Sequence, residues 1–488
     1  MQIVRAVVRA GCVGLAVLAL AATAYRHDAG VGPGGRPDTD VGRVFMSRPD
    51  LVAPLIVTSD YADTTSARSG DDDLVFIAPK EGEPMTGPLI LDAAGEPVWI
   101  HPLEDERAFD LRVQEYQGEP VLTWWRGAEL GVGYGYGQYV IMDQSYRVVA
   151  TVNTHGSYAD HHGMTLTDDG TALLVTYRKA PYDLSDIGGP EDGWVVNQIV
   201  QEVDVATGEI RFTWSALDHV PVEQTRIRPR HNDQMDGTLA RPVDYTHVNS
   251  VTEEPDGSLL ISGRNTSAVY RVDRETGEVD WTLGGEASDF EMVGDSEFAW
   301  QHDAQRQPDG TLTLFDNEAA PQVGDESRGL RLRLDMNAMT ARVVTEYLPP
   351  DGRLSGSQGN MQVRPNGNVF IGWGGLPYYS EYTEDGELLL DAEIVSGQSY
   401  RAFRQHWTGQ PLEPPDLVVE DGVAHVSWNG ATEVTAWRVF VGADAASARE
   451  YVTAPRSAFE TTIDVPDRPY LAVQALDDDG RVLATVEA

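Results

Sequence analysis

The chain has 488 residues and carries 77 aspartates and glutamates against 36 lysines and arginines, a net charge of −41. Such a charge repels nucleic acid and anionic membrane surfaces, so neither is expected as a partner. A chain of this length is too long to fold around one ordinary hydrophobic core. The length therefore predicts a large repeat domain with a smaller domain beside it. The 48 glycines and 28 prolines are typical of an all-β chain with many turns.

Residues 1–24 have the composition of a targeting segment. A basic start at Arg5 and Arg9 is followed by the apolar residues 10–22, and Ala22-Thr23-Ala24 offers a cleavage site. The segment is either a cleaved signal peptide or a retained N-terminal membrane anchor. Both alternatives predict an extracytoplasmic protein, secreted or anchored to the outer face of the cell membrane.

Residues 25–70 are rich in Gly, Pro, Asp, Ser and Arg and are predicted to be a linker, with one candidate strand at Leu51–Thr58. The only cysteine, Cys12, lies in the targeting segment. No disulfide is therefore expected in the mature protein.

Residues 71–411 are predicted to repeat one four-stranded unit, which is clearest at Asp244–Gly285. That unit has four short strand-like runs separated by turn residues such as Pro255-Asp256-Gly257, the pattern of an antiparallel meander. The runs are His247–Thr252, Ser258–Ser262, Ala268–Asp273 and Val279–Leu283.

Asp-Gly or Asn-Gly turns mark further copies, and they end at Gly170, Gly257, Gly310 and Gly367. Six copies are predicted, starting near Leu74, Gly118, His162, His247, His302 and Gly359. A four-stranded unit repeated at this spacing is the signature of a β-propeller. We expect six blades, with five or seven as alternatives.

Residues 412–488 follow a proline-rich boundary, and their alternation of apolar and polar residues differs from that of the repeats. Trp428, Trp437 and Tyr470 in short strand-like runs resemble a fibronectin type III β-sandwich. We assign this domain no chemistry.

Because the innermost strand of each blade lines the central channel, residues at matching offsets from the turns should converge there. Eight residues before a turn glycine stand His162, Asn249 and His302, with His247 two residues before Asn249 on the same strand face. Seven or eight residues after the glycines stand Arg178, Arg264 and Asn317, and His161 neighbours His162. Histidine, arginine and asparagine at one channel mouth predict a site that binds an anion and offers a nucleophile.

Two other interpretations of these histidines stay open. A single strand histidine is most often a hydrogen-bonded core residue, but a shared register in several blades argues against that here. Three imidazoles can also bind zinc, with Asp160 and Asp303 as nearby carboxylates. Arg264 would be repelled by a dication, so we expect no metal and no cofactor.

Three segments resemble the arylsulfotransferase (arylsulfate sulfotransferase) family, and the resemblance extends over about residues 71–407. They are DHHGMTLTDDGTALLVTYR, DYTHVNSVTEEPDGSLLISGRNTSAVYRVDRETGEVDW and WQHDAQRQPDGTLTLFDN. The resemblance implies a six-bladed propeller that moves a sulfuryl group from an aryl sulfate to a phenol by a ping-pong route, without a nucleotide sulfate donor.

The resemblance also implies roles for individual residues. His302 would be transiently sulfated, and His247, Asn249 and Arg264 would hold the sulfate oxygens. His162 would hold sulfate or move the phenol proton. Members of the family carry an N-terminal β-sandwich and a disulfide that this chain does not match, so dimerisation and acceptor preference do not carry over. The alternatives are an aryl sulfate hydrolase that uses the same site and a non-catalytic propeller that binds a ligand.

Overall fold

The computed structural model describes residues 42–61, 72–82, 84–130, 133–154, 158–232 and 234–488. The predicted targeting segment and residues 25–41 and 62–70 of the predicted linker lie outside the described residues. In the described part of the chain, no helix combines the length and the apolar composition needed to cross a membrane.

The prediction of an all-β fold built from four-stranded units is confirmed. Six antiparallel sheets, called ring sheets 1 to 6 below, each contain a set of four strands. In five of them the four strands are consecutive in the sequence and pair in that order. In ring sheet 1 the first strand, β29, comes from the other end of the ring's sequence. Ring sheet 1 is β29 (Gln398–Gln405), β4 (Leu74–Glu81), β5 (Leu89–Leu91) and β6 (Pro97–Ile100). Ring sheet 2 is β7 (Arg107–Tyr116), β8 (Glu119–Leu130), β9 (Tyr134–Met142) and β10 (Val148–Val152). Ring sheet 3 is β11 (Thr165–Leu166), β12 (Thr171–Tyr182), β13 (Gly193–Asp204) and β14 (Ile210–Ser215), with β15 (Val243–Asp244) parallel to β13.

The remaining ring sheets follow in chain order. Ring sheet 4 is β16 (Val248–Glu253), β17 (Leu259–Gly263), β18 (Ala268–Val272) and β19 (Val279–Gly284). Ring sheet 5 is β21 (His302–Arg306), β22 (Leu312–Asp316), β23 (Arg328–Asp335) and β24 (Thr340–Tyr347), with β20 (Glu291–Val293) parallel to β24. Ring sheet 6 is β25 (Asn360–Val363), β26 (Val369–Gly372), β27 (Tyr378–Tyr382) and β28 (Leu388–Ile394).

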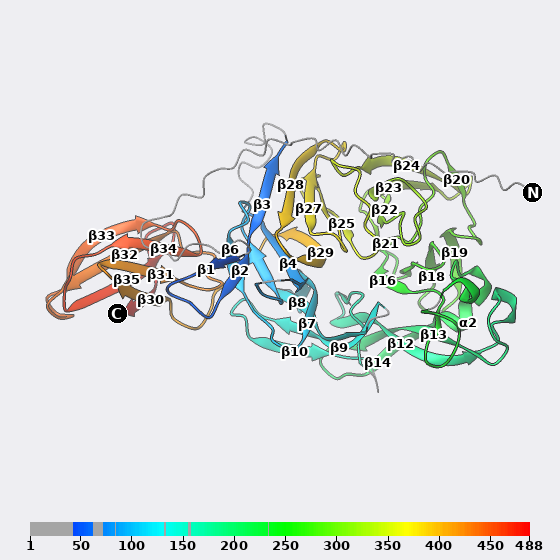
Figure 1. The fold of residues 1–488 in the computed structure, drawn as a ribbon, viewed down its shortest axis with the longest axis horizontal. Helices are drawn as coiled ribbons and strands as arrows, with labels where there is room; N and C mark the ends of the chain where they lie inside the picture. The colour runs from blue at the N-terminus through cyan, green and yellow to red at the C-terminus, as the bar shows by residue number, and fades with distance from the viewer. Residues whose placement is uncertain (1–41, 62–71, 83, 131–132, 155–157, 233) are drawn as a thin grey trace, which may run out of the picture.

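The six sheets form a closed ring. Each innermost strand contacts the innermost strand of the next sheet, in the order β7, β11, β16, β21, β25 and β29, and the sheet of β29 returns to β7. Figure 1 shows the sheets arranged around a common centre, from blue through cyan and green to yellow. Closure depends on β29, which pairs with β4 although the two strands come from opposite ends of the ring.

Neighbouring sheets pack face to face, and the hydrophobic cores lie between them. The second strand of three units, β17, β22 and β26, is buried at every position, because sheets cover both of its faces. This explains the continuous apolar runs after the turns. The turn glycines Gly170, Gly257, Gly310 and Gly367 have φ of 73° to 90°, a conformation that glycine adopts without steric cost.

The linker prediction does not hold for residues 42–61, which are part of the fold. β1 (Gly42–Val44) pairs with β2 (Val52–Pro54), and β3 (Ile56–Asp60) adds a fifth strand to ring sheet 6 beside β28. The candidate strand at Leu51–Thr58 therefore exists as two strands. Turn-rich composition concealed these short strands, because the partners that stabilise them lie far away in sequence.

The insertion between ring sheets 3 and 4 carries short helical turns. They are α2 (Ala216–His219), η2 (Val222–Gln224) and η3 (Pro229–His231), and η1 (Ser185–Ile187) lies in the hairpin between β12 and β13.

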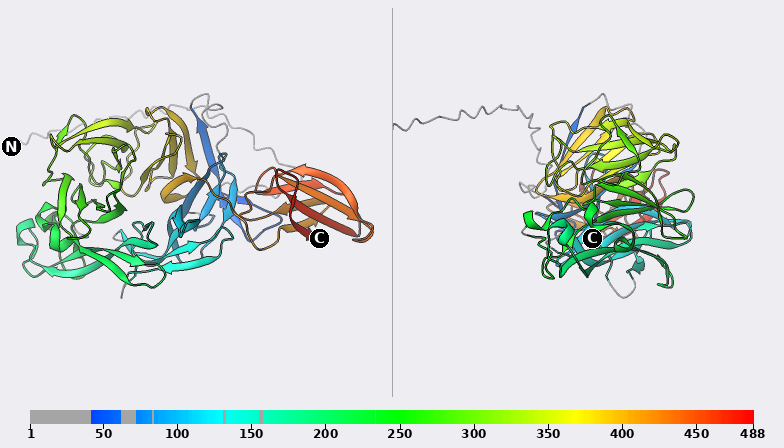
Figure 2. Two further views of the ribbon diagram at one scale, coloured as in Figure 1. Left: turned by 180° about the vertical axis from the view of Figure 1, so that it is seen from behind. Right: turned by 90° about the vertical axis from the view of Figure 1, so that its right-hand side faces the viewer.

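The C-terminal domain has two sheets. One contains β30 (Asp416–Glu420), β31 (Val423–Ser427) and β34 (Glu460–Asp464). The other contains β33 (Arg449–Pro455), β32 (Ala436–Gly442), β35 (Tyr470–Leu476) and β36 (Val482–Glu487). Figure 2 shows this domain projecting from one side of the ring.

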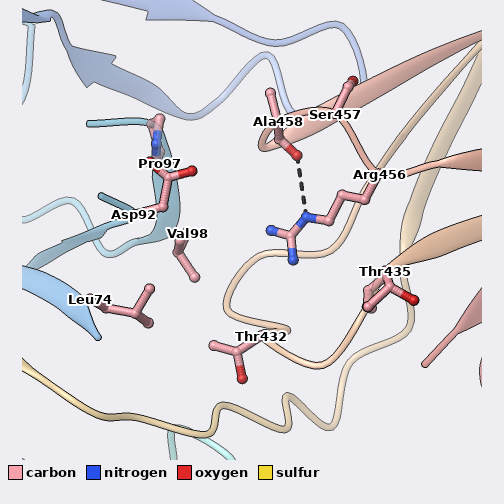
Figure 3. Close-up of a pocket in the computed structure, with 10 residues that line it drawn as sticks. Leu74, Asp92, Pro97, Val98, Thr432, Thr435, Arg456, Ser457 and Ala458 are labelled. Atoms are coloured by element: carbon pink, nitrogen blue, oxygen red, sulfur yellow. Dashed lines mark hydrogen bonds between the residues drawn. The ribbon is translucent and has the colours of Figure 1, made fainter. Parts of the chain in front are cut away.

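The domain is fastened to ring sheet 1. Asn429 exchanges two hydrogen bonds with the backbone of Ile100, and the Gly430 N–H donates to Val98 at 2.8 Å. A cavity of about 290 Å³ lies in this seam, with Asp92 and Arg456 on its wall (Figure 3). The cavity shares no residue with the predicted site.

Candidate functional site

Three histidines from three ring sheets come together where the inner strands begin. His162 precedes β11, His247 precedes β16, and His302 is the first residue of β21. Their exposed fractions are 3%, 8% and 1%, so His247 is the most accessible. The rings of His162 and His247 lie edge to face with centroids 4.6 Å apart. After desolvation, the positive charges of Arg264, His247 and His162 act to lower the pKa of His302, so these side chains are close enough to interact.

The inner strands at His247 and His302 have irregular register. The register of β16 shifts between Val248 and Ser250, and that of β21 shifts between His302 and Gln305. His247 has φ of 52° and Asp303 has φ of 56°, which are uncommon for residues with a Cβ. β-Bulges of this kind redirect side chains at the ends of strands and are frequent beside active sites.

Two of the histidines are held by carboxylates. His162 Nδ1 forms a short hydrogen bond with Asp160, and His247 Nδ1 lies 2.5 Å from Asp244 Oδ2. A carboxylate at Nδ1 orients the imidazole and stabilises its protonated form. Both histidines are therefore suited to accept and return a proton through Nε2.

His302 differs because its Nδ1 partner is a neutral amide. Its Nδ1 lies 2.7 Å from Asn317 Oδ1, and its Nε2 accepts the Gln358 backbone N–H at 3.1 Å. Since Nε2 accepts a hydrogen bond, the ring hydrogen is on Nδ1 and donates to Asn317. His302 is thus a neutral imidazole with its lone pair on Nε2.

Burial keeps His302 and His162 neutral near pH 7. Desolvation lowers the pKa of His302 well below 6.5, and the cation of Arg264 adds to this effect. The pKa of His162 is also lowered well below 6.5, first by desolvation and then by the charges of His247 and Arg401. Desolvation raises the pKa of Asp160, while His161 and backbone N–H groups oppose that rise.

Arg264 follows β17 and supplies a half-buried cation that forms no ion pair with a carboxylate of the described residues. It donates to Asn265 Oδ1 at 2.8 Å and to the backbone oxygens of Gly356 at 3.0 Å and Ala320 at 3.4 Å. Its guanidinium stands 5.1 Å from the ring centre of Trp300. Desolvation lowers the pKa of Arg264 to about 10. A guanidinium that has lost water and gained only carbonyl oxygens favours an incoming anion.

Asn249 and Arg178 are placed differently from the prediction. Asn249 is fully buried, and its Nδ2 donates to the Gln301 backbone oxygen at 2.7 Å, which links ring sheets 4 and 5. One of the two N–H donors of its amide is therefore engaged by the fold. Arg178 is exposed on β12, and the preceding residue, Tyr177, is turned toward His162 and His247 instead.

Asn317 and His161 are buried at the site, but neither is open to a substrate. Asn317 Nδ2 donates to the backbone oxygens of Ser355 and Gln358, each at 3.0 Å, so this side chain orients His302 and holds a loop. His161 stacks on His162 at 4.4 Å, with its Nδ1 3.7 Å from Asp160. Asn317 and His161 therefore position His302 and His162, respectively, and do not contact a substrate themselves.

A buried ion cluster at the ring centre was missed by sequence reasoning. Arg401, on β29, pairs with Asp110 at 3.0 Å and lies 3.6 Å from Asp303. It also donates to the backbone oxygens of Asn249 at 3.0 Å and His162 at 3.4 Å. Arg401 therefore ties ring sheet 1 to the loops and strands that carry the histidines.

Asp110 could have been found from the sequence, because it stands eight residues before Gly118, the offset shared by His162 and His302. Arg401 could not, because β29 and β4 are not joined by a turn from which an offset can be counted.

Among the residues that the structure describes, Asp160, His161 and His162 are the buried group whose donor atoms are close enough to hold a metal ion. This group differs from the three histidines that the sequence suggested. His162 Nδ1 is already bonded to Asp160, and the positive charges of Lys80 and Arg401 act on the same histidines. Such charges disfavour a dication.

Comparison with known proteins gives one family and distant structural similarity. A protein of unknown function from Bacteroides caccae aligns at 12% identity and a TM-score of 0.41, covering 69% of this chain and all of its own. A catalytically inactive virginiamycin B lyase from Staphylococcus aureus with quinupristin aligns at 8% identity and a TM-score of 0.33, covering 77% of this chain and 97% of its own. No curated protein matches the chain.

The arylsulfotransferase (ASST) family model matches residues 112–395. Since that match covers more than half of the sequence, the chain belongs to the arylsulfotransferase (ASST) family.

Proposed function

We propose that this protein is an arylsulfate sulfotransferase that moves a sulfuryl group from an aryl sulfate to a phenol through a sulfated His302, without a nucleotide donor. The observation that carries the proposal is the contrast among the histidines. His302 has an amide at Nδ1 and is held neutral, whereas His162 and His247 have carboxylates. A neutral imidazole attacks without first losing a proton, and a carboxylate-held imidazole moves protons.

In the first half-reaction, His302 Nε2 donates its lone pair to sulfur, and the bond between sulfur and the aryl oxygen breaks. The electron pair leaves with the phenol oxygen, which takes a proton from an imidazolium. Exposure favours His247 as that proton donor, with Asp244 stabilising its charged form. Arg264 offsets the negative charge of the sulfuryl oxygens, since donors fixed before the reaction lower its barrier.

In the second half-reaction, an acceptor phenol gives its proton to His247, and its oxygen attacks sulfur. The bond between Nε2 and sulfur breaks, and the electron pair returns to Nε2. Because the same proton site serves both halves, donor and acceptor are expected to use it in turn, as a ping-pong reaction requires.

Two finer structural assignments belong to this proposal. The closed ring of six sheets supports a six-bladed β-propeller. In the C-terminal domain, sheets of three and four strands in the orders β30-β31-β34 and β33-β32-β35-β36 support a fibronectin type III-like sandwich. Residues 1–24 support an extracytoplasmic location, which fractionation of cells that express the full chain would test.

The test of the activity is release of a chromogenic phenol from its sulfate ester, with and without a second phenol. We expect the second phenol to accelerate release and to become sulfated. His302→Asn should abolish both, and the exposed His406→Asn serves as the matched control. Release of inorganic sulfate at a rate indifferent to phenol would indicate a hydrolase instead. Turnover by His302→Asn equal to wild type would refute the nucleophile assignment.

A further inference from the structure

Residues Ser355–Gly359, called the capping segment below, lie against the proposed nucleophile. Three site residues bind it through its backbone. Asn317 donates to the oxygens of Ser355 and Gln358, Arg264 donates to the oxygen of Gly356 at 3.0 Å, and His302 Nε2 accepts the Gln358 N–H. The capping segment is thus in contact with both the attacking atom and the anion-binding cation.

The capping segment is fixed from its other side as well. Ser355 N–H donates to Ser327 Oγ at 2.7 Å, and Ser355 Oγ donates to the Trp373 backbone oxygen at 2.7 Å. Gly375 N–H donates to the oxygen of Ser357 at 3.0 Å. These bonds hold Gln358 at a φ of 69°. Its N–H is therefore aimed at Nε2 by the fold rather than by its own side chain.

Resting on the proposed function, we infer that the backbone N–H of Gln358 is a further catalytic group of the site. In the free enzyme it donates to the Nε2 lone pair at 3.1 Å. When Nε2 attacks sulfur, that lone pair becomes the new N–S bond and can no longer accept. Sulfur takes the position along the lone pair that the N–H had faced, so the Gln358 N–H shifts off that axis and donates to a sulfuryl oxygen, one bond further out.

This transfer gives the donor two functions. Before the reaction, it occupies the lone pair of His302 and resists its protonation. During the reaction, it stabilises an oxygen whose negative charge remains on the transferring group. Return of the electron pair to Nε2 in the second half-reaction restores the original hydrogen bond. No atom or proton is gained or lost by Gln358 in the cycle.

Removal of one such preorganised donor typically lowers kcat by about 10²- to 10³-fold. Gln358→Pro deletes the N–H, and Gln358→Gly keeps it and tolerates the positive φ. We expect Gln358→Gly to retain a kcat at least about tenfold above that of Gln358→Pro. The loss should fall on kcat rather than KM, since the donor acts on the group in transfer. Equal activity of the two variants would refute the inference.

Because proline also changes the backbone conformation, a measurement without substitution at 358 is needed. Ser357-Gln358 is the single Ser-Gln pair in the sequence. Carbonyl-¹³C serine combined with ¹⁵N glutamine therefore gives one amide correlation from this pair in the full, deuterated chain. In the free enzyme we expect this proton downfield and protected from exchange, and His302→Asn should move it upfield and expose it. If His302→Asn changes neither the chemical shift nor the exchange protection of this amide, the contact is refuted.

The sulfated form is then produced with an aryl sulfate and no acceptor, and its mass is checked for one added sulfuryl group. We expect the Gln358 amide to change shift but to stay protected, because it has exchanged one acceptor for another. Sulfated protein in which this amide exchanges freely would refute the catalytic role. Absence of the added mass would refute the proposed function itself, so the two failures are distinguished.

Discussion

Arg264→Gln tests whether this half-buried cation serves an anion rather than the fold. The pKa of Arg264 falls from 12.5 to about 10, so desolvation disfavours its charge by about 3 kcal/mol. Its hydrogen bonds to Asn265, Gly356 and Ala320 offset this by roughly the same amount, at about 1 kcal/mol for each of these partly exposed bonds. Loss of the charge and of those bonds should nearly cancel. The free energy of unfolding is expected to change by less than about 1 kcal/mol.

The effect on activity should be much larger. A guanidinium about 4 Å from a sulfate charge is worth about 4 kcal/mol at the effective dielectric of a protein site, or roughly 10³-fold in kcat/KM. Urea denaturation measures the stability, and phenol release from an aryl sulfate with a phenolic acceptor measures kcat/KM. A loss of more than about 3 kcal/mol of stability, or a kcat/KM within about tenfold of wild type, would contradict this account.

Four further outcomes are expected. Asp244→Asn removes the carboxylate from His247 and should lower kcat by about 10²-fold, most for acceptors of high pKa; an equal loss for all acceptors in a phenol series would argue against proton transfer. His161, His162 and His302 have folded-state pKa values lowered well below 6.5, so the unfolded chain takes up protons near pH 6.5 while the folded chain does not. Stability should be fully present above pH 6.5 and fall as pH drops from 6.5 toward 5, and a flat urea midpoint over that window would contradict it. Arg401→Met removes the cation shared by buried Asp110 and Asp303, while Arg112 stays 3.6 Å from Asp110, and should cost about 3 kcal/mol, against about zero for the exposed Arg481→Ala control in the same denaturation assay. Dialysis against a chelator should leave kcat unchanged, and recovery of lost activity by added zinc would show the reverse.

The repeat in the sequence was sufficient to predict the four-stranded units and the meeting of His162, His247 and His302. That inference works because turns fix the register of each inner strand, and register fixes which side chains face the centre. The same dependence on register explains why the position of Arg178 was predicted wrongly. It stands eight residues after its turn glycine, whereas Arg264 and Asn317 stand seven after theirs, and the residue at seven is Tyr177.

Features that depend on long-range contacts were not predictable from the repeat. Asn249 has the correct offset, but one of its two N–H donors is taken by the neighbouring sheet at Gln301. Residues 42–61 looked like a linker because β3 gains its stability from β28, more than 300 residues later in the sequence. The carboxylate partners Asp160 and Asp244 precede their histidines by two and three residues, a local signal that the offset rule did not use.

Pairing of β29 with β4 has a consequence for when the protein becomes active. It joins Gln405 to Leu74, and Arg401 enters the ring centre on that same last strand. A chain still in synthesis holds all three histidines before it holds the residue that ties their loops and strands together. Contacts between such distant residues form late, because the long loop between them must first be closed. Activity is therefore expected to arise in one step when the ring closes, and chains ending before residue 398 should be inactive even though every proposed catalytic side chain is present.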